Sequence, residues 1–268
     1  MSVGIQHTVH QLFEELSAVA PYPPGVVAVP DQIQGTSFFP GGTGLWVPEP
    51  RILPPMPVGG VMILGHDFHN EAGYKWSREN EQENLRSPTW LNLLRFLEKV
   101  PIAPGRCFFT NVYMGLRCGN ETTGTFAGSK SLEFVARCRR FFLHQLEVQR
   151  PVLVLTLGGH VPRFLAPLAP ELARWNELAG FPARDAANLS LIADVRFETV
   201  ERHRCVVASL IHPSFRPRNV GARRWNGFAG SEAEVEMVRT ALALANRESA
   251  DSRSENHSPP VNGGCPQN

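Results

Sequence analysis

The 268-residue sequence has few cysteines, no long apolar run and almost no net charge. Its five cysteines are scattered, odd in number and without a CxxC pair, so we expect reduced thiols in a cytoplasmic protein and not a disulfide framework. No run approaches the roughly 18 apolar residues that a membrane span needs, and the N-terminus lacks the basic and apolar regions of a secretion signal. A net charge of +1 excludes a polycation, so any nucleic-acid binding would depend on local clusters of basic residues.

Composition divides the chain into three parts. Residues 1–59 predict a short amphipathic helix followed by an irregular arm that wraps the core, because 21–57 is dense in proline and glycine. Residues 60–246 predict a folded domain. Residues 247–268 are polar, with one valine, and predict a disordered tail.

Within 60–246, short apolar strands alternate with helices. The pattern predicts strands at 61–64, 107–114 and 151–159, and a hairpin or strand pair within 194–214. It predicts helices at 89–100, at 131–149 with Ser129 or Ser131 as N-cap, from Val161 onward, and at 231–247. Such alternation is typical of an α/β fold in three layers, α/β/α, with a central and mostly parallel sheet.

Polar residues stand at the ends of three of these strands. Asp67 follows the first, Asn111 ends the second and His212 follows the last, and working residues of parallel sheets lie beyond the carboxyl ends of the strands. A carboxylate can orient water or stabilise a cation, an amide can read a carbonyl and its neighbouring N–H, and an imidazole can donate to an oxygen that becomes anionic. Hydrolysis of an N-glycosidic bond needs this set.

Five ordered motifs resemble those of the uracil-DNA glycosylase superfamily. "GHDFH" stands where the superfamily has GQDPY or GEAPG, and "PTWLNLL" stands where a PF-type segment leads into a helix. "FFTNV" is similar to the strand that ends in a base-reading Asn, "CRRFFLHQLEVQRPVLVLTLGG" to the helix and glycine-ended strand that follow, and "IHPSF" to the HPS motif. The resemblance implies that residues 60–246 form a monofunctional DNA glycosylase domain of that fold. DNA would be its partner, and we expect a monomer with no cofactor, no metal and no obligatory protein partner.

The resemblance also implies roles for individual residues. Asp67 would position water and stabilise the sugar cation, Asn111 would read the base, and His212 would stabilise the oxygen of the departing base. A base in the stack cannot be reached, so the nucleotide must be flipped out. The residues implied around the flipped base are His66, Phe68, His69 and Trp90. Those implied in DNA contact, through the intercalating loop or to phosphates, are Gly158, Gly159, Ser214, Phe215, Arg216, Arg218, Arg223 and Arg224.

One departure from the family pattern bears on which base the enzyme would remove. In the GQDPY branch the fifth residue is a Tyr that crowds C5 of the pyrimidine, and here it is His69, which is smaller. This favours a 5-substituted cytosine, such as glucosylated hydroxymethylcytosine, because some relatives attack modified cytosines in phage DNA as an antiviral defence. Uracil excision in base excision repair is the alternative. Iron–sulfur branches use two cysteines before the first motif, and no cysteine precedes Cys107, so no cluster is expected.

Two other classes of protein stay open. His66, Asp67 and His69 could be ligands of a metal-dependent hydrolase, and distant His160, His203 or His212 could help to complete the three ligands that a catalytic site needs. A catalytically inactive DNA-binding module of the same fold is the other. Several of the residues also have plain structural alternatives: Asp67 as a helix cap, Trp90 in helix packing, Phe215 in the core and Gly158–Gly159 in a tight turn.

Overall fold

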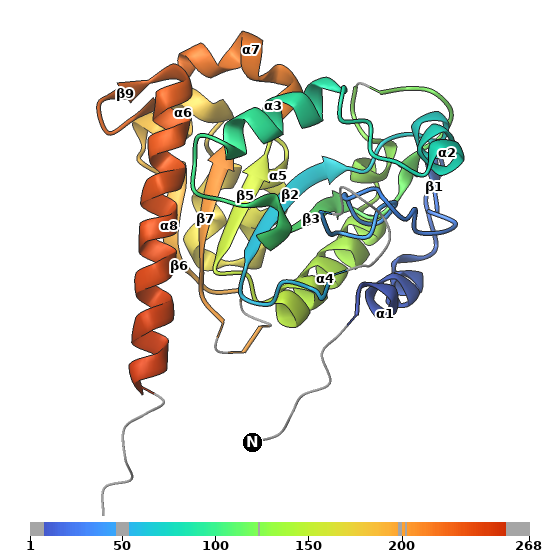
Figure 1. The fold of residues 1–268 in the computed structure, drawn as a ribbon, viewed down its shortest axis with the longest axis horizontal. Coiled ribbons are helices and arrows are strands. Elements are labelled where there is room, and N and C mark those ends of the chain that lie inside the picture. The colour runs from blue at the N-terminus through green and yellow to red at the C-terminus, as the bar shows by residue number, and fades with distance from the viewer. Residues whose placement is uncertain (1–7, 47–53, 123, 198–199, 202, 256–268) are drawn as a thin grey trace, which may run out of the picture.

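A five-stranded sheet forms the centre of the molecule (Figure 1). The computed structural model describes residues 8–46, 54–122, 124–197, 200–201 and 203–255. The strand order is β3-β2-β5-β7-β6, and the first four strands are parallel while β6 runs antiparallel to β7. The strands are β2 (Val61–Asp67), β3 (Cys107–Tyr113), β5 (Leu153–Leu157), β6 (Leu191–Val195) and β7 (Cys205–Leu210). The prediction of a mostly parallel sheet in an α/β fold is confirmed.

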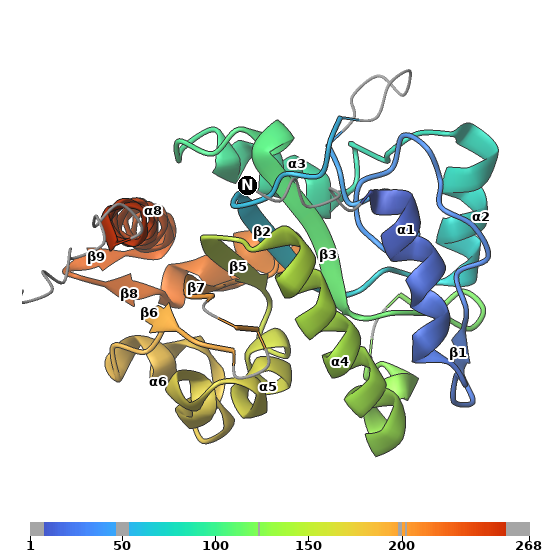
Figure 2. The same cartoon turned by 90° about the horizontal axis from the view of Figure 1, so that it is seen from below.

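Helices cover both faces of the sheet (Figure 2). One face packs on α4 (Leu132–Gln149) and α5 (Val161–Leu165), and the other packs on α3 (Pro88–Leu97) and α8 (Gly230–Glu255). Side chains alternate along β2, so that Met62 and Leu64 join the α4 side while Val61 and Ile63 join the α3 side. All four side chains are buried, which is why the strand is apolar throughout instead of alternating with polar residues.

Two serines set the starts of the main helices. Ser87 accepts a hydrogen bond from the backbone N–H of Trp90 at the start of α3, where Pro88 occupies the first helical position. Ser131 accepts one from the N–H of Phe134 at the start of α4. Of the two caps considered for this helix, Ser131 is the one used.

The N-terminal arm is part of the core. It begins with α1 (Val9–Glu14), passes through β1 (Val26–Val27), which pairs with β4 (Leu116–Arg117), and then lies along β3. Phe39 is fully buried and donates its backbone N–H to Phe109 O at 3.0 Å. A Cβ on Gly44 would come within 2.2 Å of the Phe108 ring, so only glycine allows this approach.

Several elements were not predicted. They are α2 (Glu71–Asn80), α6 (Gly180–Ala186), α7 (Arg216–Asn219) and the hairpin of β8 (Arg224–Trp225) and β9 (Phe228–Ala229). The prediction of a disordered tail from residue 247 is wrong for 247–255, because α8 continues to Glu255. Once a helix is established, each added residue gains a hydrogen bond without a new nucleation step, so a polar segment can extend it. Residues 256–268 lie outside the described residues.

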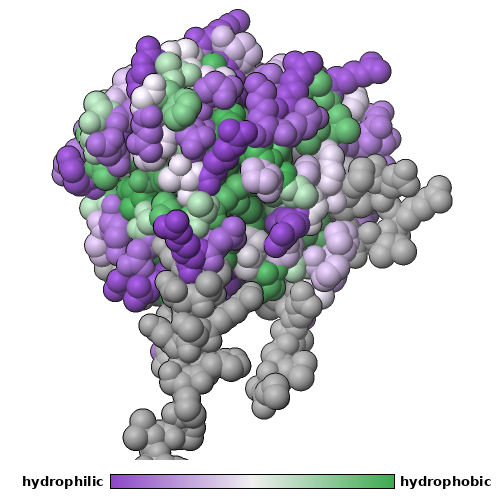
Figure 3. Space-filling model, turned by 60° about the vertical axis from the view of Figure 1, so that its left-hand side comes forward, coloured by the Kyte–Doolittle hydropathy of each residue, from purple (hydrophilic) through white to green (hydrophobic). Residues whose placement is uncertain are grey.

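We expect no membrane partner, and two features of the structure relate to this expectation: the polarity of the surface and the character of the helices. Figure 3 shows hydrophilic and hydrophobic side chains interspersed over one side of the molecule. Within the described residues, no helix combines the length and the apolar character needed to span a bilayer.

Candidate functional site

Three strand ends meet at one edge of the sheet. Asp67 is the last residue of β2, Gly158 and Gly159 follow β5, and His212 follows β7. Because β5 pairs with both β2 and β7, these residues lie close together. Gly158 has φ of +99° and donates its N–H to Leu210 O at 2.8 Å, and a Cβ there would lie 3.3 Å from the His212 Cβ. Glycine at this turn thus allows His212 to approach β5.

Asp67 is held by two neighbours. Its Oδ1 accepts from Arg117 Nε at 3.1 Å, and its Oδ2 accepts from Arg117 Nη2 at 2.9 Å and lies 2.7 Å from His66 Nδ1. The Asp67 side chain is 11% exposed. Burial by itself raises the pKa of this carboxyl, but the hydrogen bonds and charges of His66 and Arg117 outweigh burial and lower the pKa below its ordinary value. Asp67 is therefore a carboxylate at neutral pH.

His212 is a neutral imidazole with a defined tautomer. Burial lowers its pKa to about 4, against the opposing attraction of the Asp67 carboxylate. The backbone N–H of Ser214 donates to His212 Nδ1 at 3.3 Å, and the Ser214 hydroxyl lies 2.8 Å from the same nitrogen. A backbone N–H can only donate, so Nδ1 is the acceptor and the ring proton resides on Nε2. The predicted DNA contact Ser214 thus serves to orient His212.

The structure adds Arg117 and Tyr113, which the sequence did not indicate, and it places His160, considered only as a possible metal ligand, beside His66. Arg117 reaches Asp67 from β4, and no local pattern indicated that it would. The ring of His160 lies 5.2 Å from that of His66, centroid to centroid, and its position directly after the Gly158–Gly159 turn was a usable signal. Tyr113 lies edge-on to His66 at 5.1 Å. Burial raises the pKa of Tyr113 to about 12, so its phenol stays protonated.

Asn111 lies one pleat behind Asp67 and faces the arm. It pairs in register with Gly65, and its side chain is only 2% exposed. Its Nδ2 donates to Phe39 O at 2.9 Å, and its Oδ1 would lie 2.3 Å from a Cβ on Gly65. In this structure the amide therefore holds the arm on the sheet.

The other residues predicted around the base are divided between the arm, the surface and the core. Phe68 packs on Gly41 of the arm, where a Cβ would come within 2.2 Å of the ring. His69 is exposed, and its Nδ1 accepts from the Asn70 N–H at 2.8 Å. Trp90 is 4% exposed and packs against Phe38, Trp46 and Phe109. The prediction of Trp90 as a stacking residue is corrected, because its ring belongs to the core beneath α3.

The residues predicted to contact DNA also separate into two groups. Phe215 is 49% exposed, and Arg218 and Arg224 are exposed. Arg216 and Arg223 are buried and pair with Glu234, so the prediction that they contact DNA is corrected. A buried guanidinium needs carboxylate partners, and these partners occupy the donors that a phosphate would require.

The geometry required for a metal site is not found. In the part of the chain that the structure describes, no three His, Cys, Asp or Glu side chains are grouped as metal ligands would be. His66 and Arg117 occupy both oxygens of Asp67, and His69 Nδ1 accepts a backbone hydrogen bond. Among the described residues, the side chains at the strand ends therefore provide one carboxylate and several hydrogen-bond donors, and not a set of metal ligands.

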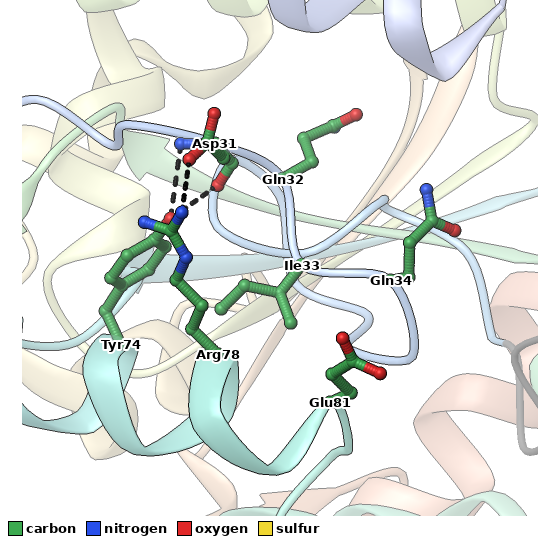
Figure 4. A pocket seen from close by; sticks show the side chains of 7 residues that line it. All are labelled: Asp31, Gln32, Ile33, Gln34, Tyr74, Arg78 and Glu81. Atoms are coloured by element: carbon green, nitrogen blue, oxygen red, sulfur yellow. Dashed lines mark hydrogen bonds and ion pairs between the residues drawn. The ribbon is translucent and has the colours of Figure 1, made fainter.

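A surface pocket lies elsewhere, between the arm and α2 (Figure 4). Its lining includes Tyr74, whose hydroxyl donates to Asp31 O at 2.9 Å, and Arg78, which pairs with Asp31 at 3.1 Å. None of the strand-end residues lines it. Asp31, Tyr74 and Arg78 already bond one another, and the convergent groups at Asp67 and His212 are the better candidate site.

Comparison with known proteins gave no family. No protein-family model matches the sequence, and no curated protein matches it significantly.

Proposed function

We propose that the chain is a monofunctional DNA glycosylase that flips out a non-standard pyrimidine nucleotide and hydrolyses its N-glycosidic bond. The observation that supports this is the pairing of an ionised Asp67 and a neutral His212 at one edge of the sheet. Cleavage of this bond develops positive charge on the sugar and negative charge on the base. A carboxylate and an N–H donor side by side suit these two charges.

Asp67 would act on the sugar and on water. A carboxylate has about four acceptor directions, and the described residues use three of them, through Arg117 Nε, Arg117 Nη2 and His66 Nδ1. The remaining direction, on Oδ1, is available to orient the attacking water. The same charge would stabilise the oxocarbenium-like sugar.

His212 would act on the leaving base. Its Nε2–H can donate to the pyrimidine oxygen on which negative charge grows, and the cap on Nδ1 keeps the proton on Nε2. With a pKa of about 4, the ring remains a neutral donor across the physiological range. No lysine stands among the site residues, which supports hydrolysis over Schiff-base lyase chemistry.

DNA would approach across the His212 end of the sheet. The exposed ring of Phe215 is suited to enter the stack in place of a flipped nucleotide, and Arg218 and Arg224 are suited to phosphate contact. Asn111 could read the base only after its amide left Phe39 O, so the proposal does not depend on it.

For the substrate, we favour a 5-modified cytosine of phage DNA, which would make the enzyme an antiviral defence. A Cβ on Gly73 would lie 3.0 Å from three atoms of the His69 ring, so this ring packs on α2, a position that would leave C5 of the pyrimidine uncrowded. Uracil released in base excision repair is the competing substrate.

The test is mass spectrometry of free bases released by the purified protein in EDTA. Its substrates are uracil-containing DNA and phage DNAs with modified cytosines. We expect release of a modified cytosine and alkali-labile abasic sites. Release of uracil alone assigns the enzyme to repair, loss of activity in EDTA favours the metallohydrolase, and tight binding without any abasic product identifies an inactive binder.

A further inference from the structure

Glu234 of α8 bonds both ends of the turn that carries His212. It is fully buried, and its Oε1 accepts from the backbone N–H of Ile211 at 2.8 Å. Its Oε2 accepts from Nη1 of Arg216, which directly follows Phe215. One carboxylate therefore fixes the chain immediately before His212 and immediately after Phe215.

A second carboxylate extends this anchorage to residue 224. Arg223 donates to Glu234 Oε1, to Ser209 O of β7 at 2.9 Å, and through Nε and Nη2 to Asp185 of α6 at 2.9 and 3.0 Å. Asp185 also accepts the backbone N–H of Arg224 at 2.9 Å. The segment 211–224 is thus tied to α6, α8 and the sheet by buried charged hydrogen bonds.

Helix α3 holds the same turn from its other side. Asn92 Nδ2 donates to Pro213 O at 3.0 Å, and the guanidinium of Arg216 lies 4.4 Å from the centroid of the Phe96 ring. With Pro213 held by α3 and Ile211 by α8, His212 has little freedom to move. These bonds hold the backbone of the turn, while Ser214 orients the ring of His212.

We propose that Glu234 is a positioning residue for His212. The inference rests on the proposed glycosylase function and deepens it. A donor must lie within hydrogen-bond distance of the departing base in the transition state, and a misplacement of about 1 Å can cost about 100-fold in rate. Glu234 touches neither substrate nor reacting atoms, and it acts through the backbone at Ile211.

The test compares two substitutions at Glu234 with two controls on the same helix. E234D keeps the charge but withdraws it by one methylene, and E234Q keeps the reach but removes the charge. E236Q alters a half-buried carboxylate that lies 3.7 Å from Arg239. V238A removes core volume at a fully buried side chain, and it reports the effect of lost stability alone.

Three readouts separate positioning from stability. They are kcat against KM for DNA, hydrogen exchange of the Ile211 amide, and the ¹⁵N shifts of the His212 ring, all measured where each variant is folded. For E234D we expect kcat lower by about 10- to 100-fold with KM changed by less than about 3-fold. We also expect faster exchange at Ile211 and His212 shifts that indicate a mixture of tautomers. E236Q should match the wild type, and V238A should keep its kcat.

The inference is overturned if E234D keeps wild-type kcat, Ile211 protection and His212 shifts, or if V238A of equal melting temperature loses as much kcat. If the wild-type protein releases no base, the proposed function fails. The positioning role is then decided by the exchange and the ring shifts, which require no activity. If E234D does not fold, the same three readouts are taken on E234Q, and the same outcomes support or overturn the inference.

Discussion

The substitution D67N gives the most direct test of the site. Asn has the shape of Asp and its Oδ1 can still accept from Arg117 Nε, but its Nδ2 replaces the oxygen that accepts from Arg117 Nη2. The variant is therefore assayed at a temperature at which it is folded, so that the rate reports the loss of charge. What disappears is the anion that would face the positive sugar in the transition state.

The expected effect can be worked out from the charges. At an effective dielectric constant of about 20 and a separation of about 5 Å, a carboxylate stabilises a unit positive charge by about 3 kcal/mol, or about two orders of magnitude in rate. Arg117 lies 2.9 Å from Asp67 and keeps its positive charge in the variant. Its repulsion of the sugar cation is the same in both proteins and cancels from the comparison, so a reduction of about 100-fold is expected.

The assay is single-turnover base release with enzyme in excess, read by alkaline cleavage of a labelled oligonucleotide. D67N should bind DNA at least as tightly as the wild type, because a negative charge that faces phosphates has been removed. D31N is the matched control, since Asp31 is exposed, pairs with Arg78 and lies outside the site. A D67N rate within about 3-fold of the wild-type rate would refute the assignment of Asp67.

Three further predictions concern stability and DNA binding. R117M should lower the free energy of unfolding in urea by about 3 kcal/mol, because it leaves the buried carboxylate of Asp67 without its cation. The double variant R117M/D67N should regain part of that free energy. If the losses of the two single variants add up in the double variant, the two side chains are not coupled. His203 is 7% exposed, and burial and the charge of Arg150 lower its pKa to about 4. Its contribution to stability is therefore complete above about pH 6.5 and is lost as the pH falls toward 4, by on the order of 3 kcal/mol. In urea unfolding, H203Q should reduce the pH dependence over that window and leave the part that His212 contributes. R218A and R224A should each reduce the slope of log K against log salt by about 0.9, and unchanged slopes would remove these residues from the DNA interface.

The main strands and helices, and the edge of the sheet at which the strands end, could be predicted from the sequence. Apolar runs defined β2, β5 and β7, and Ser87 and Ser131 marked helix starts, because burial and capping are local requirements that each segment expresses in its own residues. Parallel strands carry their carboxyl ends to one edge, so the neighbourhood of Asp67 and His212 followed from topology alone.

The hydrogen-bond and ion-pair partners of the polar side chains could be identified only from the folded structure. Four arginines lie within nine positions of one another in the sequence, yet Arg216 and Arg223 are buried on carboxylates while Arg218 and Arg224 are exposed. The same applies to Asn111, whose amide bonds an arm more than 70 residues away, at Phe39. A local sequence pattern shows which side chains are present but not which distant groups pack against them. In a buried environment, those distant groups determine whether a side chain is charged and which hydrogen bonds it makes.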